Sequence, residues 1–424
     1  MKKFLLGLLI IAAAFMFNCQ QGTVASNANI PVTASFNLKW PRVEQAVAYE
    51  VEVVDGKEIK DDKKLKDAKL LWHSSYIYTV GCNIQLPESY VGQELYWRVR
   101  GLNLERKPLS EYTPWTKYVV PSTATQERKP EITGFMNKGN GTTLLYPVYA
   151  WIPLEGVNKY EVEILSEMPE NPNGTEPSKY RIEVLDAQGF DLYDDKARLS
   201  DKELYWRVIG KDKNNKPVGV YSDVATMGVS TAKKYEVAVL GDSITHGGGS
   251  ISYPPTNWDY SYLSYLDFDV LNLGLSGDTS AMTLERFDRD VLPFHPKYLL
   301  ILTGSNSLRA SFSAESIIDD LESIKQKCLK NDITPIFLTL PPVNPANIYL
   351  AFKENTSEDW QEKLTKINTY IKGQKHIDIN KDMIDNRGNL LTRLALDGLH
   401  LDPPGKEMMA NKIQAAWPSI AKSK

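Results

Sequence analysis

The pattern of apolar and polar residues changes near residue 230, and the change separates two kinds of structure. Before it, apolar and polar residues alternate with a period of two, as in Tyr49–Val53 (YEVEV). Alternation over short stretches predicts β-strands that each bury one face. After it, continuous apolar runs alternate with segments of helical periodicity, which predicts a parallel sheet with helices on both faces.

The first part of the chain contains an internal repeat. Trp40–Val54 (WPRVEQAVAYEVEVV) matches Trp151–Leu165 (WIPLEGVNKYEVEIL), and Glu94–Gly101 (ELYWRVRG) matches Glu203–Gly210 (ELYWRVIG). The two offsets are 111 and 109 residues. A nearly constant offset indicates two copies of one domain of about a hundred residues.

Alternating strands broken by turn residues favour a β-sandwich for each copy. The motif WxxVxxAxxYEVEV, with a later YWRVRG and SEYTPW, resembles fibronectin type III or related immunoglobulin-like modules, at residues 30–125 and 128–230. The tryptophans recur at equivalent positions, so we expect them in the two cores rather than on the surface as platforms for sugars. They are Trp40, Trp97, Trp151 and Trp206.

A short linker at residues 228–234 precedes a third domain, which we assign to residues 234–424. Apolar positions at helical spacing predict helices within Ile317–Cys328 and Trp360–Ile371, the second preceded by a capping box of Thr356 and Asp359. The strand-like runs are Tyr235–Leu240, Phe268–Leu273, Tyr298–Thr303, Pro335–Leu340 and His376–Ile379.

The N-terminus predicts export. Lys2 and Lys3 precede the apolar stretch Phe4–Phe17, which is too short to span a bilayer, and Cys19 follows. This arrangement resembles a bacterial lipoprotein signal at residues 1–19, with Cys19 lipidated and residues 20–29 as a tether, although Met16 and Asn18 depart from the usual processing site. We therefore expect a membrane-anchored lipoprotein of the cell envelope, in the outer membrane and facing the periplasm or the outside.

Composition narrows the classes of partner. The 424 residues are 42% apolar and 24% charged, with a net charge of −4, which suits a globular multidomain chain and gives no basic surface for nucleic acid. Cys82 and Cys328 lie in different predicted domains, so we expect both to be buried and unpaired. No Cys or His spacing indicates a metal site, and we expect no cofactor.

Ser243 is the first candidate for chemistry. The apolar run before Gly241 ends in Gly-Asp-Ser, which would place the Ser243 hydroxyl at the carboxyl edge of the sheet, where open α/β sheets bind ligands. An ordinary strand-to-loop turn is the alternative. Asp397 stands three residues before His400, a spacing that lets the carboxylate accept from Nδ1–H and leaves Nε2 for a serine proton. A surface pair is the alternative there.

Two further candidates follow the second and third predicted strands. Gly277 has no Cβ, so its backbone N–H can approach a substrate closely. The side-chain amide of Asn306 can donate to a developing oxyanion. Each position alone is equally consistent with a polar loop.

Together these residues resemble the four blocks of the SGNH hydrolases, also called GDSL esterases, over residues 234–420. The blocks are Gly241-Asp242-Ser243, Gly277, Gly304-Ser305-Asn306 and Asp397-Gly398-Leu399-His400.

The resemblance implies a flavodoxin-like sheet and a serine mechanism. Ser243 would be the nucleophile, His400 the base and Asp397 its orienting carboxylate. The N–H groups of Ser243 and Gly277 and the side chain of Asn306 would form the oxyanion hole. Ser307 stands where the family usually has aspartate, which leaves open how firmly the Asn306 loop is held.

An exported enzyme of this kind meets polysaccharides and lipids. We expect it to hydrolyse short-chain O-acyl esters, acetyl esters above all, on carbohydrate or another small ester substrate. Tyr253, Trp258 and Asn344 are candidate substrate contacts, with packing as the alternative for the rings. A lipase, lysophospholipase or thioesterase comes second. A non-catalytic glycan-binding or adhesion lipoprotein is the rival from another class.

Overall fold

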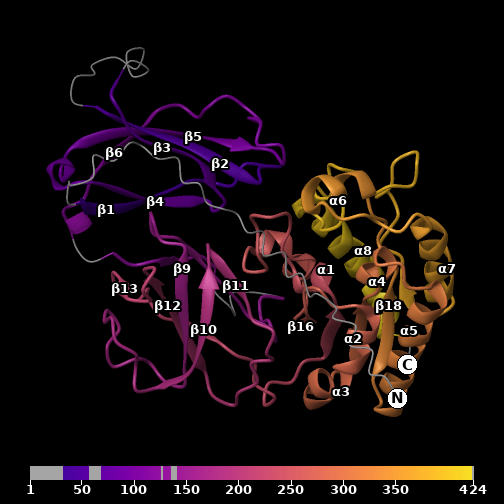
Figure 1. Ribbon diagram of the computed structural model, residues 1–424. Helices are drawn as coiled ribbons and strands as arrows, with labels where there is room; N and C mark the ends of the chain where they lie inside the picture. Colours follow the sequence, from indigo (N-terminus) through magenta and orange to yellow (C-terminus); the bar gives the residue numbers. More distant parts are fainter. Residues whose placement is uncertain (1–31, 57–67, 126–127, 135–140, 423–424) are drawn as a thin grey trace, which may run out of the picture.

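The computed structural model describes residues 32–56, 68–125, 128–134 and 141–422 (Figure 1). The predicted signal, the tether and the lipidation residue Cys19 lie outside these residues. In the described part of the chain, no helix is both long and apolar enough to cross a membrane.

The first β module, residues 32–125, consists of two antiparallel sheets that share one core. One sheet pairs β1 with β4, and the other has the order β3-β2-β5-β6. Side chains of both sheets meet in a single buried cluster that includes Phe36 of β1, Val51 of β2 and Val99 of β5. The strands are β1 (Val32–Lys39), β2 (Ala48–Asp55), β3 (Leu70–Ile77), β4 (Gly81–Pro87), β5 (Glu94–Leu102) and β6 (Thr116–Val119).

The second β module, residues 128–229, has one continuous eight-stranded sheet among its described residues. Its order is β13-β12-β9-β10-β11-β8-β7, with β14 also paired to β12. The β10–β11 hairpin joins the two halves of this sheet, whereas the corresponding halves of the first β module stay separate. The strands are β7 (Glu131–Ile132), β8 (Val148–Ile152), β9 (Lys159–Leu165), β10 (Arg181–Gln188), β11 (Asp191–Tyr193), β12 (Leu204–Lys211), β13 (Pro217–Val218) and β14 (Ala225–Met227).

The sequence repeat reappears as a structural repeat. Tyr49 faces Gly101 across β2 and β5, and Tyr160 faces Gly210 across β9 and β12, in the same register. Each tyrosine hydroxyl accepts a hydrogen bond from the backbone N–H six residues earlier, at 3.2 Å in the first module and 2.8 Å in the second. The fibronectin type III assignment itself stays a prediction.

The four repeated tryptophans lie in or beside the two cores. Trp40, Trp151 and Trp206 are buried, while Trp97 is half-buried with its ring 6.1 Å from that of Trp40. The rings therefore pack inside the modules, as the repeat predicted.

The α/β domain, residues 235–422, is built on a five-stranded parallel sheet of order β16-β15-β17-β18-β19. This order reverses at β15, and the carboxyl edge of such a reversal point is where open α/β sheets bind ligands. Helices lie on both sides of the sheet (Figure 1). All five strands lie within two residues of the predicted runs: β15 (Val237–Gly241), β16 (Val270–Gly274), β17 (Tyr298–Leu302), β18 (Thr334–Leu338) and β19 (His376–Ile377).

The α-helices of this domain are short near the carboxyl ends of the first strands and longer afterwards. They are α1 (Ser243–His246), α2 (Ser280–Glu285), α3 (Phe287–Asp290), α4 (Ser305–Arg309), α5 (Ala314–Lys330), α6 (Pro345–Phe352), α7 (Trp360–Lys372) and α8 (Pro403–Lys422). The buried face of α5 carries Ile317, Leu321 and Cys328, as its apolar spacing predicted.

The predicted capping box before α7 is wrong. The Asp359 side chain makes no capping bond to the helix, and the buried Thr356 hydroxyl has no hydrogen-bond partner among the described residues. Asp359 instead accepts from Ser357 and pairs with Lys363 at 2.8 Å. The Asp359 carboxylate therefore bonds to the Lys363 side chain, one turn into the helix, and does not cap a backbone N–H.

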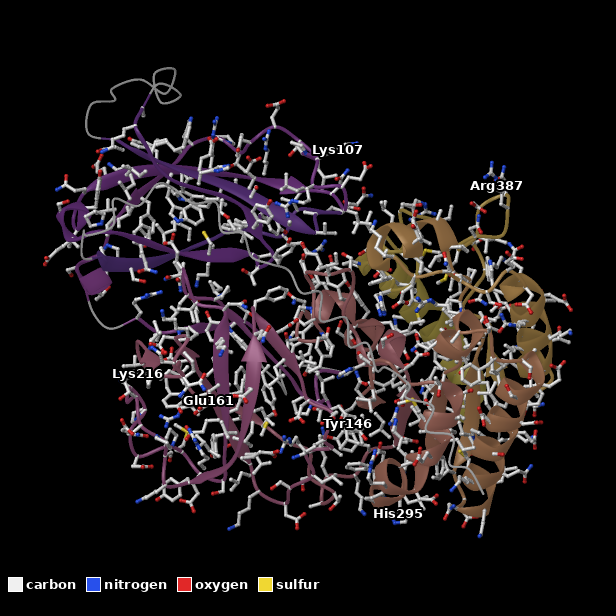
Figure 2. The ribbon with its side chains drawn as sticks, viewed as in Figure 1. Lys107, Tyr146, Glu161, Lys216, His295 and Arg387 are labelled. Atoms are coloured by element: carbon white, nitrogen blue, oxygen red, sulfur yellow. The ribbon has the colours of Figure 1, made fainter. Side chains whose placement is uncertain are left out.

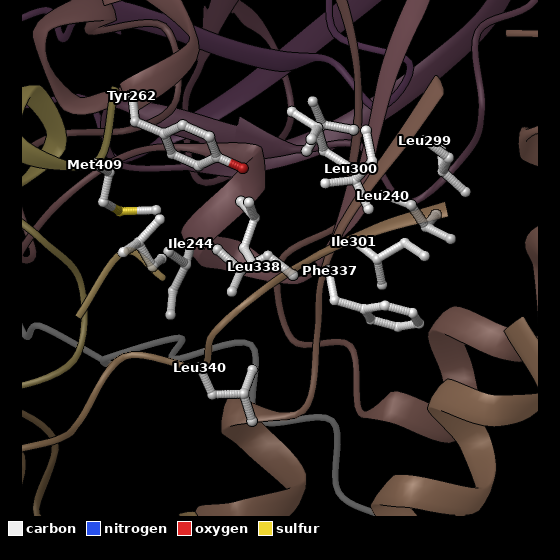
Figure 3. Packing of buried hydrophobic residues seen from close by; sticks show 14 of the residues in the cluster. Leu240, Ile244, Tyr262, Leu299, Leu300, Ile301, Phe337, Leu338, Leu340 and Met409 are labelled. Carbon is white, nitrogen blue, oxygen red and sulfur yellow. The ribbon is translucent and has the colours of Figure 1, made fainter. Parts of the chain in front are cut away.

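The core of the α/β domain fills both faces of the sheet. Leu240, Leu300 and Phe337 on three neighbouring strands are almost fully buried (Figure 3). The same cluster includes Leu145 and Tyr146 of the second β module. Cys82 and Cys328 are free and buried, as predicted.

Main-chain hydrogen bonds join the second β module to the sheet of the α/β domain. Leu144 forms a parallel bridge with Asn272 of β16. The Leu145 N–H donates to the Asn272 carbonyl at 3.1 Å, and the Asn272 N–H donates to the Thr143 carbonyl at 3.4 Å. The edge of β16 is therefore covered by a segment of the preceding module.

Candidate active site

Ser243 is the first residue of α1, directly after β15. Asp242 caps the helix, since its carboxylate accepts from the Ile244 N–H at 3.1 Å. Gly241 is required before it, because a Cβ there would lie 2.1 Å from the Leu302 carbonyl oxygen of the neighbouring strand. This close passage sets Ser243 at the carboxyl edge of the sheet, where it is 8% exposed.

Ser243, His400 and Asp397 form one continuous hydrogen-bonded chain. The Ser243 Oγ lies 2.9 Å from His400 Nε2, and His400 Nδ1 lies 2.9 Å from Asp397 Oδ2. The other Asp397 oxygen accepts from the N–H groups of Leu399 and His400, each at 2.8 Å. Gly398, with φ of 82°, allows the turn that brings both N–H groups onto one carboxylate.

The electrostatics of this chain keep the carboxylate ionised. Burial raises the pKa of the fully buried Asp397, but the attraction of His400 and the hydrogen bonds from its ring and backbone outweigh that effect, so the net pKa is lowered. An ionised Asp397 accepts a hydrogen bond from the Nδ1–H of His400, which keeps the proton on Nδ1. The free lone pair of Nε2 is then directed at the Ser243 hydroxyl, the arrangement that lets an imidazole remove a serine proton.

Three candidate oxyanion donors stand at the ends of three adjacent strands. In the described part of the chain, neither the Ser243 N–H nor the Gly277 N–H donates to a protein acceptor. Gly277 has φ of 91°, and the place its Cβ would take is open space. The Asn306 amide donates one hydrogen to the Asp278 carbonyl at 2.9 Å, while Arg309 lies 3.5 Å from its oxygen. The second amide hydrogen of Asn306 remains available.

Ser307 holds the Asn306 loop although it replaces the usual aspartate. It is fully buried, and its Oγ accepts from the Ser280 N–H at 3.0 Å. The Ser280 hydroxyl lies 3.1 Å from the same Oγ and donates to Asp320 at 2.6 Å. The serine thus joins α4 to the start of α2, and a carboxylate from α5 completes the network.

Arg286 links the carboxyl ends of β15 and β16 to the loop after Gly277, and sequence reasoning missed it. It lies beyond the end of α2, with its side chain 4% exposed, and pairs with Asp278 at 2.5 Å. Its other nitrogens donate to the carbonyl oxygens of Leu273 at 2.8 Å and Gly241 at 2.9 Å. Arg286 stands among other polar and charged residues in the sequence, so no local signal indicates its burial or what it binds.

Lys406 was also missed. It lies in the first turns of α8, is fully buried, and donates to the Ile244 carbonyl at 2.9 Å. Burial lowers its pKa to about 8 against the attraction of Asp397, Asp242 and Asp402. The buried Lys406 ammonium group is therefore attracted by Asp397 of the candidate triad and by Asp242 and Asp402 near it.

The predicted substrate contact at Tyr253 is wrong. Tyr253 is 3% exposed, its ring stacks on Tyr260 with centroids 4.4 Å apart, and its hydroxyl lies 2.7 Å from that of Tyr49. It is therefore packed against the first β module, the alternative that the sequence left open. Trp258 lines a cleft of about 350 Å³ together with Arg42, and its role in substrate binding stays a prediction.

Asn344, the third predicted substrate contact, braces the His400 loop. It caps α6 through the Asn347 N–H at 3.3 Å and donates from its side chain to the Leu390 carbonyl at 3.1 Å. Its backbone N–H donates to the Gly398 carbonyl at 2.8 Å.

Over the residues that the structure describes, no three His, Cys, Asp or Glu side chains are grouped to hold a metal ion.

Residues 239–408 match the model of the GDSL-like Lipase/Acylhydrolase family. The chain is also similar to the uncharacterized lipoprotein YqeF of Bacillus subtilis, with 29% identity over 131 residues, 26% of this chain and 51% of that protein. The chain thus spans about half the length of the curated relative it matches.

Solved structures are similar to less than half of the chain. A GDSL-like lipase from Bacteroides thetaiotaomicron is 20% identical, with a TM-score of 0.36, over 43% of this chain and 88% of that one. A lipase/acylhydrolase from Enterococcus faecalis is 20% identical, with a TM-score of 0.36, over 44% and 96%. An acetyl xylan esterase is 21% identical, with a TM-score of 0.33, over 42% and 98%.

Proposed function

We propose that the protein is a serine esterase that removes short-chain O-acyl groups, acetyl above all, from carbohydrate; the match of residues 239–408 to the GDSL-like Lipase/Acylhydrolase family supports this proposal. The observation that carries the proposal is the hydrogen-bonded chain from Ser243 through His400 to the buried Asp397. These residues lie at the carboxyl edge of the sheet. The N–H groups of Ser243 and Gly277 and the amide of Asn306, at the same edge, each have a hydrogen available to donate.

The reaction proceeds through an acyl-enzyme. Ser243 Oγ attacks the ester carbonyl carbon while His400 Nε2 takes its proton. The N–H groups of Ser243 and Gly277 and the amide of Asn306 donate to the oxyanion that forms. The intermediate collapses, the bond to the leaving oxygen breaks, and His400 returns the proton to the released alcohol. Water, deprotonated by His400, then releases the carboxylic acid and restores Ser243.

Separate arguments support the two parts of the proposed substrate, the short acyl group and the carbohydrate. The sequence around the nucleophile contains no long apolar segment that could form a lid over the site. A site without such a lid suits a small acyl group. The predicted export signal and the lipid anchor at Cys19 would place the enzyme in the cell envelope among polysaccharides. The lipoprotein description of the Bacillus subtilis relative supports that location. We assign the two β modules to the fibronectin type III or immunoglobulin-like class, as spacers or binding modules.

One observation favours a longer acyl chain as the second candidate. Phe352 packs edge-on against the His400 ring with centroids 6.0 Å apart, and on the same helix Tyr349 and Leu350 are 54% and 41% exposed. Apolar side chains beside the candidate base are suited to an acyl chain, which fits a lipase, a lysophospholipase or a thioesterase.

A fluorophosphonate probe and a series of p-nitrophenyl esters test the proposal. We expect labelling that is lost in Ser243→Ala, and hydrolysis that is fastest for acetate and falls with chain length. A maximum at long chains would select the lipase candidate. An unlabelled wild type, or labelling that persists in Ser243→Ala, would contradict the enzyme assignment and leave the adhesion lipoprotein. Acetate release from acetylated xylan or pectin then tests the carbohydrate.

A further inference from the structure

Tyr146 belongs to the second β module by sequence but is buried in the α/β domain. It follows the segment that pairs with β16 and is fully buried in the same apolar cluster as the strands of that sheet. Figure 2 shows it where the second β module meets the α/β domain. Its ring lies beside Arg286, whose guanidinium carbon is 5.5 Å from the ring centroid.

The hydroxyl of Tyr146 starts one chain of bonds toward Gly277. It donates to Asp290 Oδ2 at 2.5 Å, and the same carboxylate oxygen accepts from Arg286 at 2.9 Å. Arg286 pairs in turn with Asp278, the residue after Gly277. Arg289 donates to the Tyr146 hydroxyl at 2.5 Å and keeps its proton directed at Asp290.

The backbone of Tyr146 starts a second chain toward the same glycine. Its carbonyl accepts from His246 Nε2 at 2.8 Å, and His246 Nδ1 lies 2.9 Å from the hydroxyl of Ser276. Ser276 is the residue before Gly277. The two chains therefore reach the candidate oxyanion donor from both of its neighbours.

We propose that Tyr146 is a positioning residue for the Gly277 N–H, which makes the second β module part of the catalytic unit. The inference rests on the proposed esterase function. A glycine at φ of 91° with open space around it has no side-chain packing of its own to hold it. Its N–H is then oriented by Ser276 and Asp278, which are linked to Tyr146 through His246 and through Asp290 and Arg286, respectively.

Tyr146→Phe tests the hydroxyl chain without removing the ring. Loss of a whole oxyanion donor lowers kcat about 100- to 1000-fold. Misalignment of one donor is a fraction of that, so we expect kcat to fall about tenfold with KM unchanged. Affinity for a trifluoromethyl ketone, which forms an oxyanion on Ser243, should fall by the same factor. Ser276→Ala removes the hydroxyl from the other chain and leaves only the 3.3 Å bond from the residue 276 N–H to His246 Nδ1, so kcat and inhibitor affinity should fall in the same way.

Tyr160→Phe is the matched control. Tyr160 is also buried in the second β module, where its hydroxyl accepts from the Leu154 N–H and donates to the Val157 carbonyl. It should lose stability with kcat and inhibitor affinity unchanged, so a purely structural effect is separated from positioning.

The outcomes are distinct. If wild type hydrolyses esters and Tyr146→Phe matches Tyr160→Phe in kcat and inhibitor affinity, the inference is overturned while the proposed function stands. If Tyr146→Phe does not fold, Ser276→Ala decides, and wild-type kcat in that variant overturns the inference. A wild type without esterase activity overturns the proposed function and the inference with it.

Discussion

Glu52–Arg98 in the first β module and Glu163–Arg207 in the second occupy equivalent positions of the repeat, but their surroundings differ. The first pair is bonded at 2.5 Å with 22% and 26% of the two side chains exposed. The second is bonded at the same distance with both side chains fully buried. Arg207 also donates to the Asn171 carbonyl at 2.7 Å. One repeated ion pair is therefore half-buried in one copy and fully buried in the other.

The same contrast applies to how each module meets the α/β domain. The first contacts one loop after the nucleophile, through the hydroxyls of Tyr49 and Tyr253 and a bond from Ser252 to the Val47 carbonyl. The second adds backbone hydrogen bonds to β16 and a buried ionic network. Duplicated modules thus hold different positions: one supports a loop, and the other is continuous with the sheet.

Arg207→Met should have the largest effect. Removing one partner of a buried ion pair costs about 3–5 kcal/mol of unfolding free energy. Glu163 keeps Arg181 at 2.7 Å as its other charged partner, so we expect the lower end of that range. Arg98→Met, its counterpart, should cost less than Arg207→Met, because Glu52 and Arg98 keep part of their solvent contact. Urea unfolding of both variants measures the difference, and equal losses would contradict the contrast between the modules.

His246 makes the second module's contact sensitive to acid. Burial, together with the charge of Arg286, lowers the pKa of His246 from 6.5 to about 4. Between these values the unfolded chain binds the extra proton, so stability falls as the pH drops from 6.5 to about 4, by up to about 3 kcal/mol.

His246→Gln supplies the control for this prediction, because it keeps a hydrogen-bonding side chain without a titrating group. The difference in unfolding free energy between wild type and His246→Gln should shrink steadily with decreasing pH in that window. A difference that is independent of pH would show that the neutral ring is not what the contact requires.

Gly141→Ala should weaken the docking of the second module. Gly141 has φ of 69°, and a Cβ would lie 2.2 Å from Leu263 Cβ. We expect a loss of about 2–3 kcal/mol from backbone strain and overpacking together. Gly156→Ala, at φ of 77° with nothing within 4 Å, carries the strain alone and should cost about 1 kcal/mol. Thermal unfolding of both variants tells the two contributions apart, and equal losses would count against the close contact.

Tyr253→Phe should have the smallest effect. It removes one hydrogen bond to Tyr49, which keeps its bond from the Val43 N–H, so we expect a loss of about 1 kcal/mol. KM should not change, since the ring is buried and stacked on Tyr260. A raised KM would restore Tyr253 as a substrate contact.

The parts of the fold that the sequence predicted are those with a local pattern. Period-two alternation predicted the strands, and the repeat predicted the equivalent tyrosines in the two modules. The candidate site was predictable because Ser243, Gly277 and Asn306 each follow a parallel strand, and the carboxyl ends of such strands share one edge. The four sequence blocks could be recognised without knowing the conformations of the loops that carry them.

The parts that were missed depend on contacts between distant segments. Tyr146 stands in a stretch of β pattern, and nothing nearby in the sequence indicates its bond to Asp290. Tyr253 has the same local surroundings whether its ring packs or binds a sugar, so only the position of Tyr49 decides between them. Thr356 and Asp359 have the spacing of a capping box, but Lys363 takes the carboxylate.

The strand-like pairing of Leu144 with Asn272 also has a consequence for the order in which the protein is made. Because a chain emerges N-terminus first, the segment that pairs with β16 is available before β16 itself. Until β16 emerges, Leu145 and Tyr146 have no apolar surface to cover them. The second β module therefore completes its folding only when the α/β domain arrives, whereas the core of the first can close as soon as its own strands are synthesised.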